Sequence, residues 1–168
     1  SAVFDEYLDN ARAHAGQYLR RLPDRHVGAR AGRDDLLGAL RIALPERGDE
    51  GGEVIDLIAS QAERGAVACS SPRYFGFVVG GAYPVALAAD WLVSTWDQNA
   101  GIYAISPLVS VLGEGAGQWL LDLFDLPRDA GVGFVTGCQM ANFTCLAGAR
   151  PPMVRRVGGG VGAGGLQG

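Results

Sequence analysis

Apolar residues recur with the spacing of amphipathic helices along most of the chain. Side chains three or four positions apart share one helix face, which can then be buried against a core. Two boundaries are supported by proline, because Pro84 and Pro107 suit the first turn of a helix, where the missing N–H would be unpaired anyway. Helices are therefore predicted over residues 3–21, 34–44, 52–64, 84–98, 107–125 and 139–150.

Three other stretches depart from the helical pattern. VGFVT at 132–136 is apolar and rich in β-forming residues, which predicts a buried strand. The stretch CSSPRYFGFVVGGAYP at 69–84 mixes aromatics, glycines and prolines without a period, which predicts a loop. Pro151 and Pro152 are expected to end the last helix, and the glycine-rich tail at 151–168 is expected to be flexible.

Composition and charge favour a folded, acidic protein. The 168 residues are 48% hydrophobic and 19% charged, with a net charge of −4, which suits one domain with a real core. No basic run appears, so nucleic acid and anionic membranes are not expected as partners. The longest apolar stretch, 77–93, is interrupted by glycine, proline and aspartate and is too short to span a bilayer. The first residues, SAVFDEYLDN, do not resemble a signal peptide, and we expect a cytoplasmic protein.

Two residue types limit the available chemistry. The three cysteines, Cys69, Cys138 and Cys145, have neither disulfide nor metal-ligand spacing, so reduced thiols and no metal site are predicted. All 14 basic residues are arginine, and lysine is absent from the sequence. A reaction that needs an ε-amino group therefore cannot be carried out by this chain alone.

The order Thr-Gly-Cys-Gln-Met-Ala-Asn at 136–142 follows the predicted strand and opens a helix. Free N–H groups and the helix dipole make such a junction an anion site, where Gly137 permits close backbone approach and Thr136 can add a hydroxyl. An ordinary strand–helix junction remains an alternative. Cys138 could be a nucleophile, but neither His14 nor His26 is placed by sequence as its base, which favours a packing or backbone role. Both histidines are expected to be solvated surface residues.

Three ordered stretches together resemble the group II pyridoxal-phosphate (PLP) dependent decarboxylases, the relatives of glutamate and aromatic-amino-acid decarboxylases. SPRYFGF at 71–77 is similar to the family's His-Pro-Arg-Phe-Phe segment, with Ser71 where histidine is common. ADWLVSTWDQNAGIYAISPLVSVLGE at 89–114 is similar to the stretch that leads to its Ser/Ala-Pro helix start. GFVTGCQMANFTCLAGAR at 133–150 is similar to its phosphate loop. The resemblance covers about residues 5–150.

The resemblance implies an α/β fold of PLP fold type I, like aspartate aminotransferase, and a homodimer. It implies that Thr136, Gly137, Cys138 and Gln139 bind the phosphate of pyridoxal 5′-phosphate, although serine is common in the family at the position of Gln139. It implies that Phe75, Phe77 and Val78 line the side of the pocket that faces an amino-acid substrate. The block from Asn99 to Ser106 would contribute to the neighbouring subunit's pocket.

The same resemblance implies that the sequence is the N-terminal part of a carboxy-lyase: mostly helical, with the first strand and helix of the large domain. Residues 1–65 would form a dimerisation segment, 66–150 the start of the PLP-binding domain, and 151–168 a tail. The family's Schiff-base lysine, ring-nitrogen carboxylate and aromatic stacker all lie downstream, so no catalytic residue is assigned here and activity of this chain alone is not expected. Alternatives are a non-catalytic helical dimerisation module and an unrelated helical domain.

Overall fold

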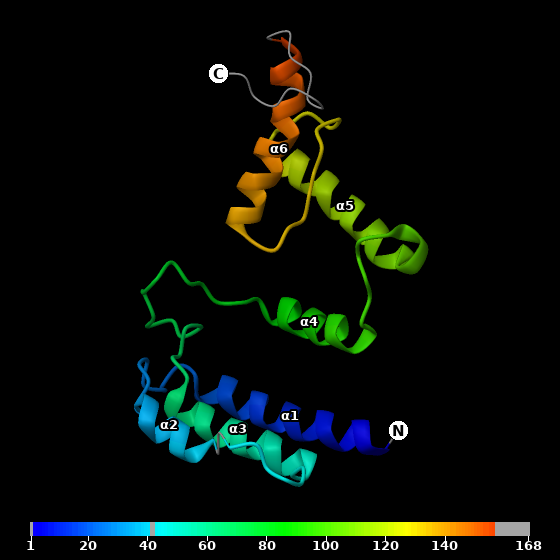
Figure 1. Ribbon diagram of the computed structural model, residues 1–168. Helices are drawn as coiled ribbons and strands as arrows, with labels where there is room; N and C mark the ends of the chain where they lie inside the picture. Colours follow the sequence, from blue (N-terminus) through cyan, green and yellow to red (C-terminus); the bar gives the residue numbers. More distant parts are fainter. Residues whose placement is uncertain (1, 41–42, 157–168) are drawn as a thin grey trace. The chain divides into compact units, whose positions relative to one another are not determined.

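The structure is a computed structural model that describes residues 2–40 and 43–156 (Figure 1). The chain divides into two compact units, Ser1–Trp91 and Leu92–Gly168. Within the described residues every regular element is a helix, in the order α1 (Ala2–Arg21), α2 (Arg33–Ala39), α3 (Gly51–Gly65), α4 (Pro84–Trp96), the 3₁₀ turn η1 (Tyr103–Ile105), α5 (Pro107–Leu123) and α6 (Cys138–Arg156).

The first unit is built around α1 and α3, which lie side by side, with α2 packed on α3 (Figure 1). Gly51 lets the start of α3 lie against the Tyr7 ring of α1, because a Cβ on Gly51 would lie only 2.6 Å from Cζ of that ring. Glu50 caps α3, since its side chain accepts the Gly52 N–H at 2.7 Å. The apolar periodicity predicted both α1 and α3 to within one residue.

The second predicted helix, over 34–44, is shorter in the structure. α2 ends at Ala39, where the N–H of Leu40 closes the last turn on the carbonyl of Leu36. Gly38 in its last turn is a poor helix former, which favours this early end. Residues 41–42 lie outside the described residues, and residues 43–44 are not helical.

The second unit contains α5, α6 and the segment that joins them. Ser106 is fully buried as the N-cap of α5, and Pro107 occupies the first helical position as predicted. On α5, Gly117 and Leu121 are buried, and the side chain of Val132 lies 3.5 Å from where a Cβ on Gly117 would be. The connecting segment therefore passes over the middle of α5.

The predicted strand at 132–136 is not formed. Residues 131–135 have no regular secondary structure, and residues 136–137 form a bend. A strand is defined by hydrogen bonds to a neighbouring strand, and no other segment of residues 2–40 and 43–156 pairs with this one. The apolar composition of VGFVT was therefore not sufficient to predict its structure.

The helix α6 does not end before the two prolines, as the sequence predicted, but continues through Pro151 and Pro152 to Arg156. Proline has a φ close to that of a helix, so the chain direction can be kept. The rings remove the N–H groups that would bond to the carbonyls of Ala147 and Gly148. The tail predicted to be flexible was placed at 151–168, but its first residues, up to Arg156, are helical; residues 157–168 lie outside the described residues. None of the helices in the described ranges is both long and apolar enough to cross a membrane.

Candidate functional site

The four residues predicted to bind phosphate lie together at the start of α6. Thr136 and Gly137 form the bend, Cys138 is the first helical residue, and Gln139 follows in the first turn. Gly137 has a φ of +155°, which residues with a Cβ rarely adopt. Its carbonyl accepts the N–H of Ala141 at 3.0 Å, which closes the first turn. The turn therefore depends on glycine at position 137, because other residues rarely adopt this φ.

This junction is able to hold an oxyanion. The first helical N–H groups, those of residues 138–140, have no partner inside the helix, and they carry the positive end of its dipole. A Cβ on Gly137 would meet nothing within 4 Å, so the approach is open. Thr136, Cys138 and Gln139 are exposed, and their side chains make no hydrogen bond with any other described residue. The phosphate of PLP is a suitable ligand for this donor set.

A hollow of about 380 Å³ lies beside this junction in the second unit. Four residues of the preceding segment and four of α6 form its wall: Gly131, Val132, Gly133 and Val135, and Ala141, Thr144, Cys145 and Gly148. None of residues 136–139 lines it. The hollow is apolar and uncharged, so it offers packing space rather than an ion-binding site.

The aromatic residues predicted to line a pocket lie on a loop, but their side chains are exposed to solvent. Phe75 and Phe77 are each 93% exposed, and Val78 is fully exposed. Phe77 and Val78 have positive φ angles of 54° and 56°, a left-handed conformation that costs a β-branched residue such as valine about 1–3 kcal/mol. These three side chains lie close in sequence on one loop, but in the first unit they do not enclose a pocket.

The beginning of this loop is fixed by residues that the sequence did not single out for this role. Ser71 is buried, and its Oγ accepts the N–H of Arg73 at 3.2 Å. The guanidinium of Arg73 donates to the carbonyl of Arg25 at 2.5 Å, just after α1. Arg73 therefore ties the loop to the helical pair, which the sequence could not indicate because the contact spans 48 positions.

Asn99, the last predicted pocket residue, belongs to the second unit. Its Oδ1 accepts the N–H of Gly101 at 2.9 Å, which forms a local turn on an exposed loop. The side chain is therefore used to shape the chain between α4 and η1. The amide nitrogen of Asn99 donates no hydrogen bond within the described residues.

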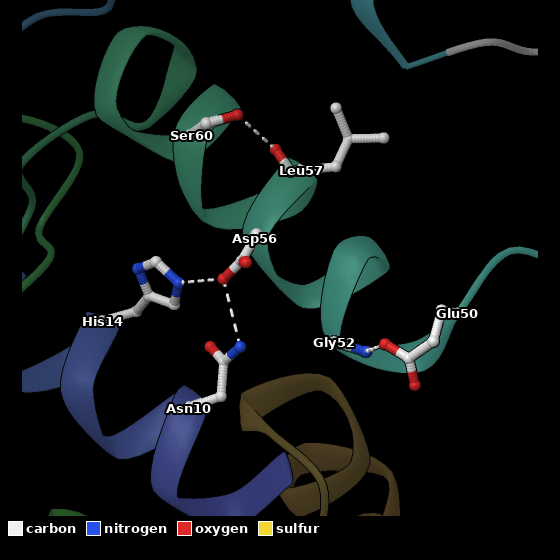
Figure 2. Close-up of polar contacts among 7 residues, drawn as sticks. All are labelled: Asn10, His14, Glu50, Gly52, Asp56, Leu57 and Ser60. Atoms are coloured by element: carbon white, nitrogen blue, oxygen red, sulfur yellow. Dashed lines mark hydrogen bonds and ion pairs between the residues drawn. The ribbon is translucent and has the colours of Figure 1, made fainter. Parts of the chain in front are cut away.

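A polar cluster that the sequence analysis did not predict joins α1 to α3 (Figure 2). Asp56 Oδ1 lies 2.6 Å from His14 Nε2 and accepts the Asn10 amide N–H at 3.1 Å. His14 was expected to be solvated, but it is partly covered and hydrogen-bonded. Ser60 is close in sequence to Asp56, yet its hydroxyl donates to the Leu57 carbonyl at 2.7 Å (Figure 2). The cluster therefore links two helices, and the serine is committed to its own backbone.

The carboxyl groups along this contact have lowered pKa values. The hydrogen bond from His14, and then that from Asn10, lower the pKa of Asp56. The hydrogen bond from the Tyr7 hydroxyl, at 2.7 Å, lowers the pKa of Glu50, and the same bond raises the pKa of Tyr7. Both carboxylates therefore contribute to the α1–α3 contact in their ionised forms.

The chain is similar to the N-terminal part of PLP-dependent decarboxylases of group II. It is 26% identical over 140 residues to an aromatic-L-amino-acid decarboxylase of Bacillus atrophaeus, which is 79% of this chain and 28% of that protein. No family model matches the chain.

Solved structures agree on the fold. Mouse CSAD in its apo form matches with a TM-score of 0.81 at 17% identity, over 90% of this chain and 32% of that one. Oryza sativa TDC with PLP also matches with a TM-score of 0.81, at 21% identity, over 95% of this chain and 36% of that one. The chain thus spans about a third of the length of the relatives it matches. The resemblance seen in the sequence, and the association of such relatives with PLP, are confirmed.

Proposed function

We propose that this chain is the N-terminal portion of a PLP-dependent amino-acid decarboxylase of fold type I, with the junction at Thr136–Gln139 as the seat of the cofactor's 5′-phosphate. The observation that carries the proposal is the coincidence of the decarboxylase likeness with an open helix start at Cys138, preceded by a glycine at positive φ. PLP would supply an electron sink for loss of CO₂ from an amino acid. Thr136, Gly137, Cys138 and Gln139 would hold its phosphate end in place.

The rest of the pocket would be shared among several segments. Phe75, Phe77 and Val78 would form an apolar wall on the substrate side, and their high exposure leaves them free to contact a ligand or another chain segment. Asn99 would contribute to the pocket of a neighbouring subunit. The chain would be organised as a helical segment over 1–65, the start of the PLP-binding domain over 66–150 and a tail over 151–168, in a cytoplasmic protein.

A homodimer is part of this proposal. α1 has no buried residue, and it exposes large apolar side chains at Val3, Phe4, Leu8 and Leu19. Exposed apolar faces of this kind mark contacts with other protein surfaces. The same face supports the second candidate function, a non-catalytic helical dimerisation module, which differs in predicting no response to PLP.

Catalysis by this 168-residue chain alone is not part of the proposal. The sequence has no lysine, so it lacks the side-chain amine to which PLP-dependent enzymes attach the cofactor. We expect no release of CO₂ from amino acids when PLP is added to the chain. Reduction with borohydride should likewise give no phosphopyridoxyl-lysine, because the sequence has no lysine; detection of that adduct by mass spectrometry would show that the sample contains more than this sequence.

The cofactor seat is tested by PLP binding to the 168-residue chain, followed by the absorbance of PLP in equilibrium dialysis. Gly137→Val should weaken binding because valine does not adopt the φ of Gly137. The matched control is Gly133→Val, where a Cβ would meet nothing within 4 Å and φ is not in the left-handed region. Pyridoxal, which lacks the phosphate, should bind more weakly than PLP to the unaltered chain.

The outcomes separate the two candidate functions. Binding of PLP that is lost in Gly137→Val and kept in Gly133→Val supports the decarboxylase portion. A folded dimer that ignores both PLP and phosphate supports the dimerisation module. Light scattering after gel filtration gives the oligomeric state, and a monodisperse monomer that melts cooperatively would contradict the dimer in either form.

A further inference from the structure

The first unit has a basic hollow at the C-terminal end of α1, which the proposed decarboxylase function does not use. It measures about 350 Å³, and its wall holds four arginines, at positions 20, 21, 25 and 30, and His26. Asp24 and Glu63 are the carboxylates of the wall. Positive groups therefore exceed negative ones in a concave site, where the fields of neighbouring charges add.

The contacts show which of these charges are already neutralised. Glu63 lies 3.3 Å from Arg21 and also forms an ion pair with Arg25. Arg25 uses its remaining terminal nitrogen on the carbonyls of Ala62 and Glu63. Among the described residues, the side chains of Arg20 and Arg30 form no hydrogen bond or ion pair. Glu63 thus supplies one negative charge to two arginines, and Arg20 and Arg30 are the arginines of the wall without a partner among the described residues.

Arg25, a residue of the wall, also has a donor without an acceptor. The side chain of Arg25 is only 6% exposed, and its Nε is a buried polar atom that has no hydrogen-bond partner among the described residues. A buried unpaired donor is costly, and such atoms are usually satisfied by a ligand or by water. His26 is anchored at the rim, because its Nδ1 donates to the carbonyl of Gly28 at 2.8 Å.

We propose that this hollow binds a small oxyanion, a phosphate or carboxylate group, held between the guanidinium groups of Arg20 and Arg30 with Arg25 behind it. The planar guanidinium presents paired N–H donors that match the oxygens of such groups. The hollow has room for an anion of this size. The free carboxylate of Asp24 opposes binding, so the two unpaired arginines are both needed to make the site attractive. This site is separate from the cofactor seat and does not depend on it.

Inorganic phosphate is the probe, titrated into the 168-residue chain at constant ionic strength. The Nε–Hε signals of the arginines are followed by NMR, because they report the hollow itself. We expect saturable shifts at Arg20, Arg25 and Arg30. The variant Arg20→Gln/Arg30→Gln should weaken binding by about tenfold or more, since loss of a charged hydrogen bond costs about 1.5–3 kcal/mol.

The matched control is Arg12→Gln/Arg33→Gln, which removes the same charge from exposed sites outside the hollow. It should bind phosphate like the unaltered chain. Far-UV circular dichroism confirms that both variants are folded. Equal weakening in both variants, or shifts that rise without saturation, would overturn the proposal and indicate general charge attraction.

The cofactor seat could also bind phosphate, so the two sites are separated by where the signals move. Phosphate that shifts only the backbone amides of residues 138–140, and leaves the arginine signals unchanged, would overturn the proposed hollow and leave the cofactor seat standing. A second titration with acetate distinguishes the source of the oxyanion. Tighter binding of phosphate indicates a phosphorylated ligand, and tighter binding of acetate indicates a carboxylate.

Discussion

Replacing Arg25 by methionine tests what holds the end of α1 to the end of α3. Methionine keeps an unbranched apolar stem but has no charge and no donor. The guanidinium donates to the carbonyls of Ala62 and Glu63 at 2.7 and 2.6 Å and forms an ion pair with the Glu63 carboxylate. It also lies 5.0 Å from the centre of the Tyr18 ring.

The magnitude follows from which groups are left without partners. The carbonyl of Ala62 keeps the N–H of Ala66 at 3.0 Å, whereas the carbonyl of Glu63 loses its only hydrogen bond among the described residues. Hydrogen bonds from charged donors contribute about 1.5–3 kcal/mol each. The Glu63 side chain is 46% exposed, so it regains water, and its ion pair is worth about 1 kcal/mol or less. The ordering of a long arginine side chain offsets up to about 2 kcal/mol. Arg25→Met should therefore lower the free energy of unfolding by about 2–5 kcal/mol.

Urea unfolding followed by far-UV circular dichroism measures this loss. A double-mutant cycle with Glu63→Gln separates the ion pair from the carbonyl contacts. We expect the coupling between the two substitutions to be less than half of the loss in Arg25→Met. A loss below about 1 kcal/mol would refute the structural role of Arg25. A coupling as large as the whole loss would show that the ion pair, and not the backbone carbonyls, holds the two helix ends.

Three further substitutions test the helical pair and the aromatic loop. Gly51→Ala should destabilise the first unit by about 1–3 kcal/mol in urea unfolding, because the alanine Cβ would overlap the ring of Tyr7. The loss caused by Gly51→Ala should be smaller in a Tyr7→Leu background. An equal loss in both backgrounds would contradict a clash with the Tyr7 ring. The pKa of Asp56 is lowered in the folded chain, so its ionised carboxylate stabilises the fold above the unfolded-state pKa of 3.8. This stabilisation is lost as the pH falls further through the folded-state pKa. Thermal melts at decreasing pH should therefore show a smaller drop in melting temperature for Asp56→Asn than for the unaltered chain. Val78→Asn should stabilise the chain by about 1 kcal/mol, because asparagine tolerates the positive φ and the valine side chain is fully exposed; a lower melting temperature would refute strain at this position.

The helices could be predicted because the information is local. Apolar periodicity located α1 and α3, and Pro84 and Pro107 marked helix starts that the structure confirms. The strand at 132–136 was wrong because strand formation depends on a partner, which no local pattern supplies. The continuation of α6 through Pro151 was also missed, because proline disfavours a helix interior without excluding it.

In the candidate sites, too, local features could be predicted from the sequence and contacts between distant residues could not. The turn at Gly137 could be found from sequence because glycine, helix start and free N–H groups follow one another along the chain. The pairing of His14 with Asp56, and the contact of Arg73 with Arg25, could not be found, because each joins residues more than forty positions apart. Their positions depend on how the helices pack, which the residue pattern leaves open. Sequence reasoning therefore located the glycine turn and the helix start that follows it, and it missed the side-chain contacts between distant residues.

These observations bear on how the proposed enzyme would be assembled. A phosphate cradle made of backbone N–H groups needs only a local turn, so Gly137 and the start of α6 can form it within one segment. Covalent attachment of PLP needs an amine, and no lysine is present in this sequence. On the proposed function, the two ends of the cofactor would thus be held by different parts of a longer protein. The aromatic side chains at Phe75 and Phe77, 93% exposed here, would be covered only when those parts come together. PLP binding by this segment should accordingly be weak, phosphate-dependent and reversible.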